Sequence, residues 1–219
     1  QWLDYWVGQL SIIPLAQSHE ILKATHMKHH AHTNDADSDP DFFHGNAENW
    51  WQAAVNVNVS YNDDGPAMKV IQQHMEKDPK FKESMEKGGI WSLFFYFAQI
   101  VLAILYPLET LFLWWIPKRV ATSYLGIVFS YFPHSGLGKG RYKDTRFWTN
   151  RIPRYLNHSM QIHTMHHMYP RICHYDEAKA IEALKPFMIE RGMPGAEHIP
   201  ERIRWNPVTY IREVYFGGR

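Results

Sequence analysis

The chain has 219 residues, which is enough for one domain with a sizeable hydrophobic core. Its 23 basic and 22 acidic side chains nearly cancel, so the composition does not indicate nucleic-acid binding. The single cysteine excludes an internal disulfide framework and any metal site built from several cysteines. What stands out instead is the content of 14 histidines and an aromatic fraction of 15%.

The first forty-odd residues combine a short apolar segment with a polar, histidine-rich one. Residues 5–16 are apolar but too short to cross a bilayer alone, so we expect them to be the end of a span that starts before Gln1. Residues 17–44 are polar and carry the first histidine cluster. They finish in an acidic run, 34–41, whose composition predicts a turn and loop in which aspartate side chains bond the backbone.

Residues 66–88 carry apolar side chains at helical spacing among lysine and glutamate, which predicts a surface or interfacial helix. Proline inside a helix removes a backbone donor, so we expect the helix to break at Pro79 and a charged linker to follow.

The apolar block of residues 91–133 predicts a transmembrane helical hairpin. Residues 91–108 contain no charged side chain, and a bilayer core needs about 20 apolar residues. A second stretch, 110–133, is interrupted at Pro117 by two basic residues, with a tryptophan pair before it that suits a membrane interface. A buried hairpin of a soluble protein is the alternative. The mean hydropathy of −0.41 favours that alternative, but large polar loops around two spans would lower the average as well.

A hairpin returns the chain to the side of the membrane that it left, so residues 17–88 and 134–219 would share one face. The second part is basic close to the membrane, and the positive-inside rule makes this face cytoplasmic. The basic residues are Lys139, Arg141, Lys143, Arg146, Arg151 and Arg154. We expect one more helix to begin at Asp176 and to end at Pro186. The predicted fold is therefore all-α, a membrane hairpin with a cytoplasmic helical cap that carries the histidines.

Two histidine clusters repeat one spacing. On a helix, positions i, i+3 and i+4 lie on one face, so the three rings of each cluster would converge within one turn. Neutral imidazole is a good ligand for iron, zinc, copper and nickel. Six imidazoles exceed the four ligands of a tetrahedral zinc ion, so a dinuclear metal centre is the economical interpretation. The clusters are His26, His29 and His30 in the first and His163, His166 and His167 in the second.

Other side chains are candidates for the same centre. His134 ends the second apolar stretch, where a histidine is costly unless it is paired or ligated, so it is a candidate seventh ligand. His19 lies about two turns before the first cluster on the same helix face, and His32 points elsewhere, toward solvent or a neighbour of the ligands. Asp39 could accept the N–H of a ligand imidazole, unless it belongs to a solvated loop. We expect the remaining histidines at the surface or beside ligands, and these are His44, His74, His158, His174 and His198.

These motifs resemble those of the membrane fatty-acid desaturase and hydroxylase superfamily over about residues 5–190. The segment Arg141–Arg146 is similar to bacterial members that include β-carotene ring hydroxylases. The similar segments are Thr25-His-Met-Lys-His-His-Ala-His-Thr-Asn34 with Asp39-Pro-Asp41, Ser130-Tyr-Phe-Pro-His134, Arg141-Tyr-Lys-Asp-Thr-Arg146 and His163-Thr-Met-His-His-Met-Tyr-Pro170.

The resemblance implies a centre of two iron ions, molecular oxygen as the oxidant, and electrons from a ferredoxin, a rubredoxin or a small haem protein. By this resemblance the two clusters match the family's second and third histidine boxes, and His134 matches a further ligand in the last span. Ser130 stands where the family often has an asparagine that contacts the metal through water. The family's first box, a His-x(3–4)-His pair, has no counterpart before His26. We therefore expect residues 1–219 to be one desaturase-like domain without its N-terminal spans and first box.

The activity that the resemblance implies is the oxygen-dependent desaturation of lipid acyl chains by an integral membrane enzyme. Hydroxylation or ketolation of a carotenoid ring or an alkyl chain is the alternative, because the product depends on how the substrate lies relative to the metals. An alternative of another class is a non-catalytic or hydrolytic zinc-binding membrane protein.

Overall fold

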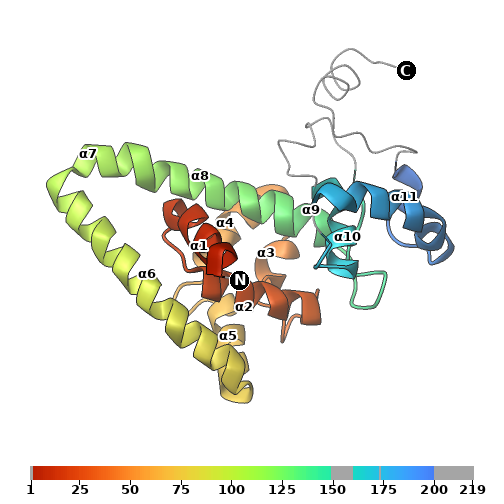
Figure 1. Cartoon of the computed structure of the whole chain (residues 1–219), viewed down its shortest axis with the longest axis horizontal. Helices are drawn as coiled ribbons and strands as arrows, with labels where there is room; N and C mark the ends of the chain where they lie inside the picture. Colours follow the sequence, from red (N-terminus) through yellow and green to blue (C-terminus); the bar gives the residue numbers. More distant parts are fainter. Residues whose placement is uncertain (1, 149–159, 173, 200–219) are drawn as a thin grey trace, which may run out of the picture. The chain divides into compact units, whose positions relative to one another are not determined.

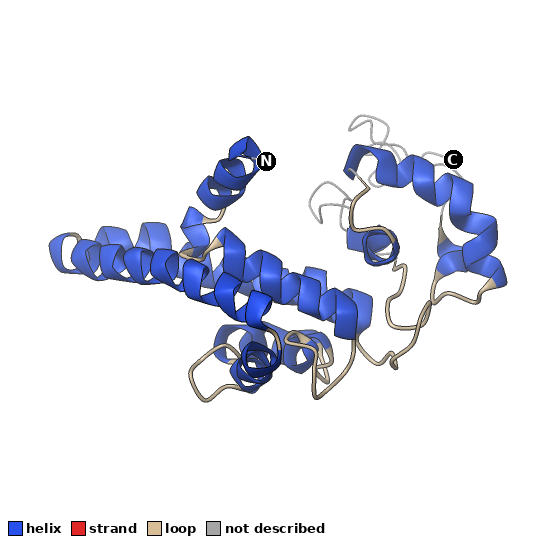
Figure 2. Cartoon of the chain, turned by 60° about the horizontal axis from the view of Figure 1, so that its bottom comes forward, coloured by secondary structure: helices blue, strands red, loops and turns tan. Residues whose placement is uncertain are grey.

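The computed structural model describes residues 2–148, 160–172 and 174–199, and all regular structure in these ranges is helical (Figures 1 and 2). The predicted all-α class is therefore confirmed for the described residues. The chain divides into two units, Gln1–Ile127 and Val128–Arg219, and each is described by itself. Four residues used in the sequence predictions lie outside the described ranges, namely Arg151, Arg154, His158 and Cys173.

The first unit begins with two helices that are joined end to end by polar contacts. Helix α1 spans Trp2–Ser11, a 3₁₀ turn spans Ile13–Leu15, and α2 spans His19–His32. The side chain of Ser18 caps α2 by accepting the N–H of Ile21 at 3.4 Å. The carboxamide oxygen of Gln9 accepts the N–H of His19 at 3.0 Å, so a side chain of α1 satisfies one of the free donors at the start of α2.

The middle of the first unit has three shorter helices. The side chain of Asn49 caps the second of them by accepting the N–H of Gln52 at 2.9 Å. Pro66 stands in the first turn of the third, where a missing N–H costs nothing. The helices are α3 (Phe42–Gly45), α4 (Trp50–Val59) and α5 (Pro66–Lys77).

Helix α5 ends at Lys77, just before Pro79, so the predicted break is confirmed. The predicted charged linker is wrong, because helix α6 spans Pro79–Leu105. Asp78 caps the helix by accepting the N–H groups of Lys80 and Phe81, and Pro79 then occupies the first turn, which tolerates proline. The charged residues that looked like a linker are the first turns of this helix. Within the described ranges, α6 is the one helix long and apolar enough to cross a membrane, and only 11% of its most apolar stretch is buried.

The chain turns at Tyr106 and continues as a second helical arm, which diverges from α6 in Figure 1. The predicted interruption at Pro117 is wrong, because the chain stays helical through it. The elements of the arm are α7 (Pro107–Glu109), the π-helical Thr110–Trp115, α8 (Ile116–Leu125), the π-helical Gly126–Tyr131 and α9 (Phe132–His134).

The two π-helical segments explain how the arm accommodates proline. A helical proline has no N–H, and its ring clashes with the carbonyl four residues earlier. Each π-helical segment stands directly before a turn that contains a proline, Pro117 or Pro133. At the end of the first segment the N–H of Ile116 bonds the carbonyl of Leu111, five residues back. The wider turn moves the crowded carbonyl away from the ring, so the helix continues.

Glycines allow the helices of the first unit to approach closely. A Cβ at Gly88 of α6 would lie 2.6 Å from Ser18 Oγ and 2.6 Å from Ile21 Cγ1 on α2. A Cβ at Gly126 would lie 2.7 Å from a methyl of Val57 on α4. Helix α2 therefore packs on α6, and α4 packs on the second arm.

The second unit is built around two helices, α10 (His163–Met168) and α11 (His174–Glu190), with 3₁₀ turns at Met160–Ile162 and Ala196–His198. Pro186 lies inside α11, so the predicted end at this residue is wrong. Met188, two residues after Pro186, is fully buried and anchors the last turn of α11. The core consists of Phe147, Ile162, Met165, Ile181, Met188, Met193, Ala196 and Ile199.

Candidate metal centre

The three histidines of the first cluster share one face of α2, as their spacing predicts. The Nε2 atoms of His26 and His30 are 3.0 Å apart, and the ring of His29 stacks on that of His26 with centroids 5.9 Å apart. His29 is only 2% exposed, while the other two are half-buried. Three imidazoles on one helical turn therefore offer nitrogen atoms to a common point beside α2.

Asp39 fixes the orientation and tautomer of His29. Its Oδ1 lies 2.9 Å from His29 Nδ1, and both side chains are nearly inaccessible. An ionised carboxylate can only accept, so Nδ1 carries the proton and Nε2 of His29 keeps its lone pair. This carboxylate–histidine pair is the arrangement that orients metal-binding imidazoles in proteins.

The acidic loop is shaped to place this carboxylate. Asn34 adopts a left-handed conformation with φ 61°, which asparagine tolerates better than most residues, and its N–H donates to Asp39 Oδ2 at 2.9 Å. The N–H of Asp41 donates to Asp39 Oδ1 at 2.8 Å. The predicted turn with aspartate-to-backbone bonds is therefore present, and its centre is Asp39.

Two other histidines of α2 face away from the cluster. The ring of His32 lies 5.2 Å from that of His74, whose Nε2 donates to the carbonyl of Ser38 at 2.7 Å. Burial, together with His74, lowers the pKa of His32. His19 lies against α1, close to Gly8 and 6.0 Å from the ring of Tyr5. These two contacts belong to helix packing and do not bring either ring to the other three.

The second cluster lies in contact with His134 within the second unit. The Nε2 atoms of His163 and His167 are 3.1 Å apart, and the ring of His166 stacks on that of His163 at 5.3 Å. The ring of His134 lies 4.8 Å from that of His167. Ser130 is buried one turn before His134 on the same arm. A residue outside the repeated motif is thus placed beside α10.

The backbone orients His134 as Asp39 orients His29. Nδ1 of His134 lies 3.0 Å from the carbonyl oxygen of Asp144, which can only accept. The proton therefore sits on Nδ1, and Nε2 keeps the lone pair. Ligand atoms of His134, His163 and His167 lie within 4.8 Å of one another, so the geometry of this donor set fits a transition-metal ion. The first cluster offers the same type of donors.

Sequence reasoning missed a buried group beside the acidic loop. The hydroxyl of Tyr61 donates to Asp41 Oδ1 at 2.5 Å, and Nε2 of His44 is 3.7 Å from the same oxygen. Burial opposes the ionisation of Asp41, but His44, His29 and the Tyr61 hydroxyl outweigh it and lower its pKa to about 2. Burial raises the pKa of Tyr61 and lowers that of His44, which is 2% exposed. The spacing of Asp41 and His44 was a usable signal, but nothing local marked Tyr61.

Comparison with known proteins gives one finding. The family model described as fatty acid desaturase matches residues 1–196, which include both histidine clusters and His134. No curated protein and no solved structure matched the chain.

Proposed function

Since the chain belongs to the fatty acid desaturase family, we propose that it is a membrane oxidoreductase that uses two iron ions and molecular oxygen to desaturate lipid acyl chains. The observation that carries the proposal is the repeated trio of imidazoles, each on one helical turn, with Nε2 pairs 3.0 and 3.1 Å apart. The proposed ligands are His26, His29, His30, His134, His163, His166 and His167.

The donor set supports iron over a single tetrahedral zinc ion. Seven imidazoles exceed the ligand number of one zinc ion, and imidazole is a suitable ligand for iron. In His29 and His134 the proton is held on Nδ1, which directs Nε2 to the metal. All seven donors are neutral, so anionic ligands from solvent would balance the charge of the metals.

The reaction that we propose removes two hydrogen atoms from adjacent carbons and forms the C=C bond. The two hydrogen atoms, together with two electrons and two protons from outside, reduce dioxygen to two water molecules. Bound iron would supply the oxidising power for this unactivated C–H bond. The electrons would come from a ferredoxin, a rubredoxin or a small haem protein. The chain's own part is to hold the imidazoles in place and to keep water away from the reacting carbon.

The membrane location of the proposal rests on α6 and the second arm. Helix α6 is apolar enough to span, and exposed side chains such as Leu93, Phe97 and Ile104 cover its surface. Side chains of this kind are stable in contact with lipid and costly in water. We place the histidines on the cytoplasmic face, because basic residues such as Lys139 and Arg141 follow the second arm.

Hydroxylation or ketolation of a carotenoid ring or an alkyl chain is the second candidate. It is favoured by the segment Arg141–Arg146, which is similar to that of bacterial carotenoid hydroxylases. The two activities are separated by product analysis in a host that makes both carotenoids and acyl lipids. New double bonds in acyl chains support desaturation, and oxygenated carotenoids support the alternative.

The test of the proposal is a pair of histidine substitutions. His166→Ala should abolish activity and lower the iron content while the protein stays in the membrane fraction. His198→Ala removes an exposed histidine of the same unit and should change neither. Zinc in place of iron together with no dioxygen uptake would refute the proposal, and full activity of His166→Ala would refute the ligand assignment.

A further inference from the structure

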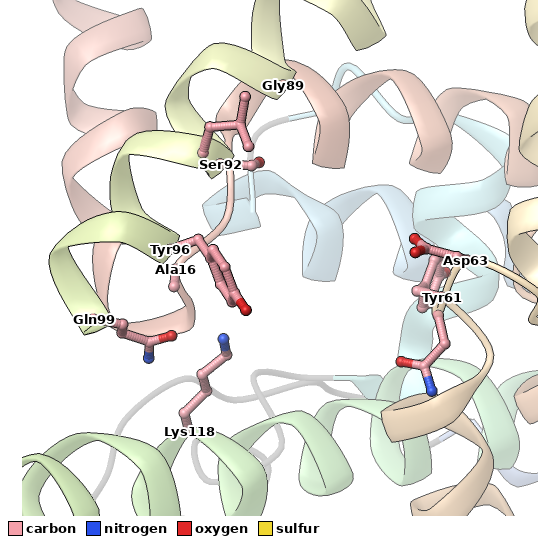
Figure 3. Close-up of a pocket in the computed structure, with 10 residues that line it drawn as sticks. Ala16, Tyr61, Asp63, Gly89, Ser92, Tyr96, Gln99 and Lys118 are labelled. Carbon is pink, nitrogen blue, oxygen red and sulfur yellow. The ribbon is translucent and has the colours of Figure 1, made fainter. Parts of the chain in front are cut away.

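A cavity of about 850 Å³ lies within the first unit, between α6, the start of α8 and the chain that follows α4 (Figure 3). It is separate from the histidines of α2, none of which lines it. Its polar lining includes Tyr61, Asp63, Ser92, Tyr96, Gln99 and Lys118.

Four of these polar residues, Ser92, Tyr96, Gln99 and Lys118, come from two otherwise apolar arms, which is unusual. Ser92, Tyr96 and Gln99 stand at positions i, i+4 and i+7 of α6, so they share one face of a helix whose other residues there are almost all apolar. Figure 3 shows the hydroxyl of Tyr96 and the ammonium group of Lys118 pointing toward one another, with Gln99 beside them. Two side chains that are able to hydrogen-bond therefore lie beside one cation.

Lys118 forms no ion pair with a carboxylate among the described residues. Other lysines of the same unit do, since Lys28 contacts Asp78 at 2.9 Å and Lys87 contacts Glu83 at 2.6 Å. Lys118 is half-buried on an arm that we place in the membrane, where an ammonium group without a counterion is costly. A ligand that brings a negative charge would remove this cost.

Asp63 limits the kind of anion that fits. Its carboxylate lies across the cavity from Lys118 in Figure 3, and the residue is exposed. This side chain would repel a headgroup with several negative charges more strongly than one with a single negative charge. Leu93, 70% exposed, also lines the cavity and offers an apolar surface next to the polar one.

We propose that this cavity binds the oxyanion of a lipid, a carboxylate or a phosphodiester, with Lys118 as the counterion and Tyr96 and Gln99 as hydrogen-bond partners. The inference deepens the proposed function and rests on it for the lipid nature of the ligand. The acyl chain would leave the cavity past Leu93 along the apolar surface of α6. The headgroup would then fix how far the chain reaches, which is what selects a carbon for reaction.

The experiment measures equilibrium binding to the purified protein in detergent at pH 8. The probes are radiolabelled oleate, its uncharged methyl ester, and dioleoyl phosphatidylethanolamine. Of the two probes that carry an oxyanion, the one that fits the cavity should bind about tenfold more weakly to Lys118→Met, as expected for the loss of a charge-assisted hydrogen bond. The affinity for methyl oleate should be unchanged. Lys118→Arg keeps the charge and should bind within about threefold of the parent protein. The charged lipid that responds to the loss of Lys118 identifies the source of the oxyanion.

Arg119→Gln is the matched control. Arg119 is the next cation on α8, but its guanidinium bonds Asn58 at 3.1 Å and lies over the Trp115 ring instead of lining the cavity. Unchanged binding by Lys118→Met, or an equal loss in Arg119→Gln, would overturn the inference. If Lys118→Met does not fold, Gln99→Leu replaces it, and unchanged oleate and phospholipid binding by that variant would overturn the inference too. Iron content is measured on the same samples, so failure of this site and failure of the metal proposal are told apart.

Discussion

Asp39→Asn should weaken iron binding while leaving the helices in place. The carboxylate is 2% exposed and accepts hydrogen bonds from His29 Nδ1, the N–H of Asn34 and the N–H of Asp41, at 2.9, 2.9 and 2.8 Å. Asparagine has nearly the same shape but only one accepting oxygen. Whichever way its amide is turned, at least one of these buried N–H groups faces an NH₂ group and loses its acceptor.

The size of the effect follows from these contacts. Removing a partner that orients a ligand imidazole costs about 10- to 100-fold in metal affinity, or about 1.4–2.8 kcal/mol. A buried N–H left without an acceptor costs about 1–3 kcal/mol of folding stability as well. We therefore expect iron affinity to fall by at least about tenfold, with a lower midpoint of thermal unfolding.

The assay is competition for iron with a chelator of known affinity, followed by metal analysis of the protein. Asp37→Asn is the matched control, because Asp37 belongs to the same loop but is exposed. It should bind iron as the parent protein does. Equal iron affinity in Asp39→Asn and the parent, or equal losses in both variants, would show that Asp39 does not act through His29.

Two further variants test helix packing and pH dependence. Gly88→Ala forces a methyl group to within 2.6 Å of Ser18 Oγ and should lower the unfolding free energy by about 1–3 kcal/mol, whereas Gly89→Ala meets no atom within 4 Å and should be neutral or stabilising in chemical denaturation. Equal effects of the two would contradict the close contact of α2 and α6. The pKa of Asp41 is lowered from 3.8 to about 2, so it contributes about 2 kcal/mol of stability above pH 4 that is lost as the pH falls toward 2. Tyr61→Phe removes one cause of the shift and moves the pKa of folded Asp41 back toward 3.8, so the loss of stability in acid should be smaller and should be complete at a higher pH in thermal unfolding; an unchanged profile would contradict this.

The sequence predicted the histidine geometry because the rule behind it is local. Side chains at i, i+3 and i+4 meet on any helix, so His163, His166 and His167 could be grouped without knowing the fold. The contact of Asp39 with His29 was also within reach, since both belong to one short segment. His134 was found by a different argument, the cost of a histidine at the end of an apolar stretch.

Prolines were the main source of error. Pro117 and Pro186 were taken to interrupt or end a helix, and neither does, while Pro79 was taken to precede a charged linker and instead begins α6. Proline starts a helix as readily as it ends one, and the choice depends on whether a capping residue such as Asp78 precedes it. For Pro117 and Pro186 the decision lies in packing and in backbone adjustments that no composition reveals.

The cavity and the contact of Tyr61 with Asp41 could not be predicted either, and the reason is a different one. They join residues from α6, α8 and the end of α4, which are far apart in the sequence, and their distances exist only after the helices have packed. The regular spacing of Ser92, Tyr96 and Gln99 did mark one face of α6 as polar. It did not indicate that Lys118 would lie opposite this face.

The two π-helical segments make the second arm sensitive to its own length. Each wide turn holds an extra residue relative to an α-helical turn, and one residue corresponds to about 100° of rotation. Loss of one residue within Thr110–Trp115 would let this stretch return to α-helical winding and would turn Ser123 and Gly126 away from their contacts with Asn58 and Val57 on α4. A conservative substitution at Leu113, which is 77% exposed, would keep the number of residues and would leave those contacts in place. Between Thr110 and Gly126, the number of residues constrains the arm more tightly than their identities do.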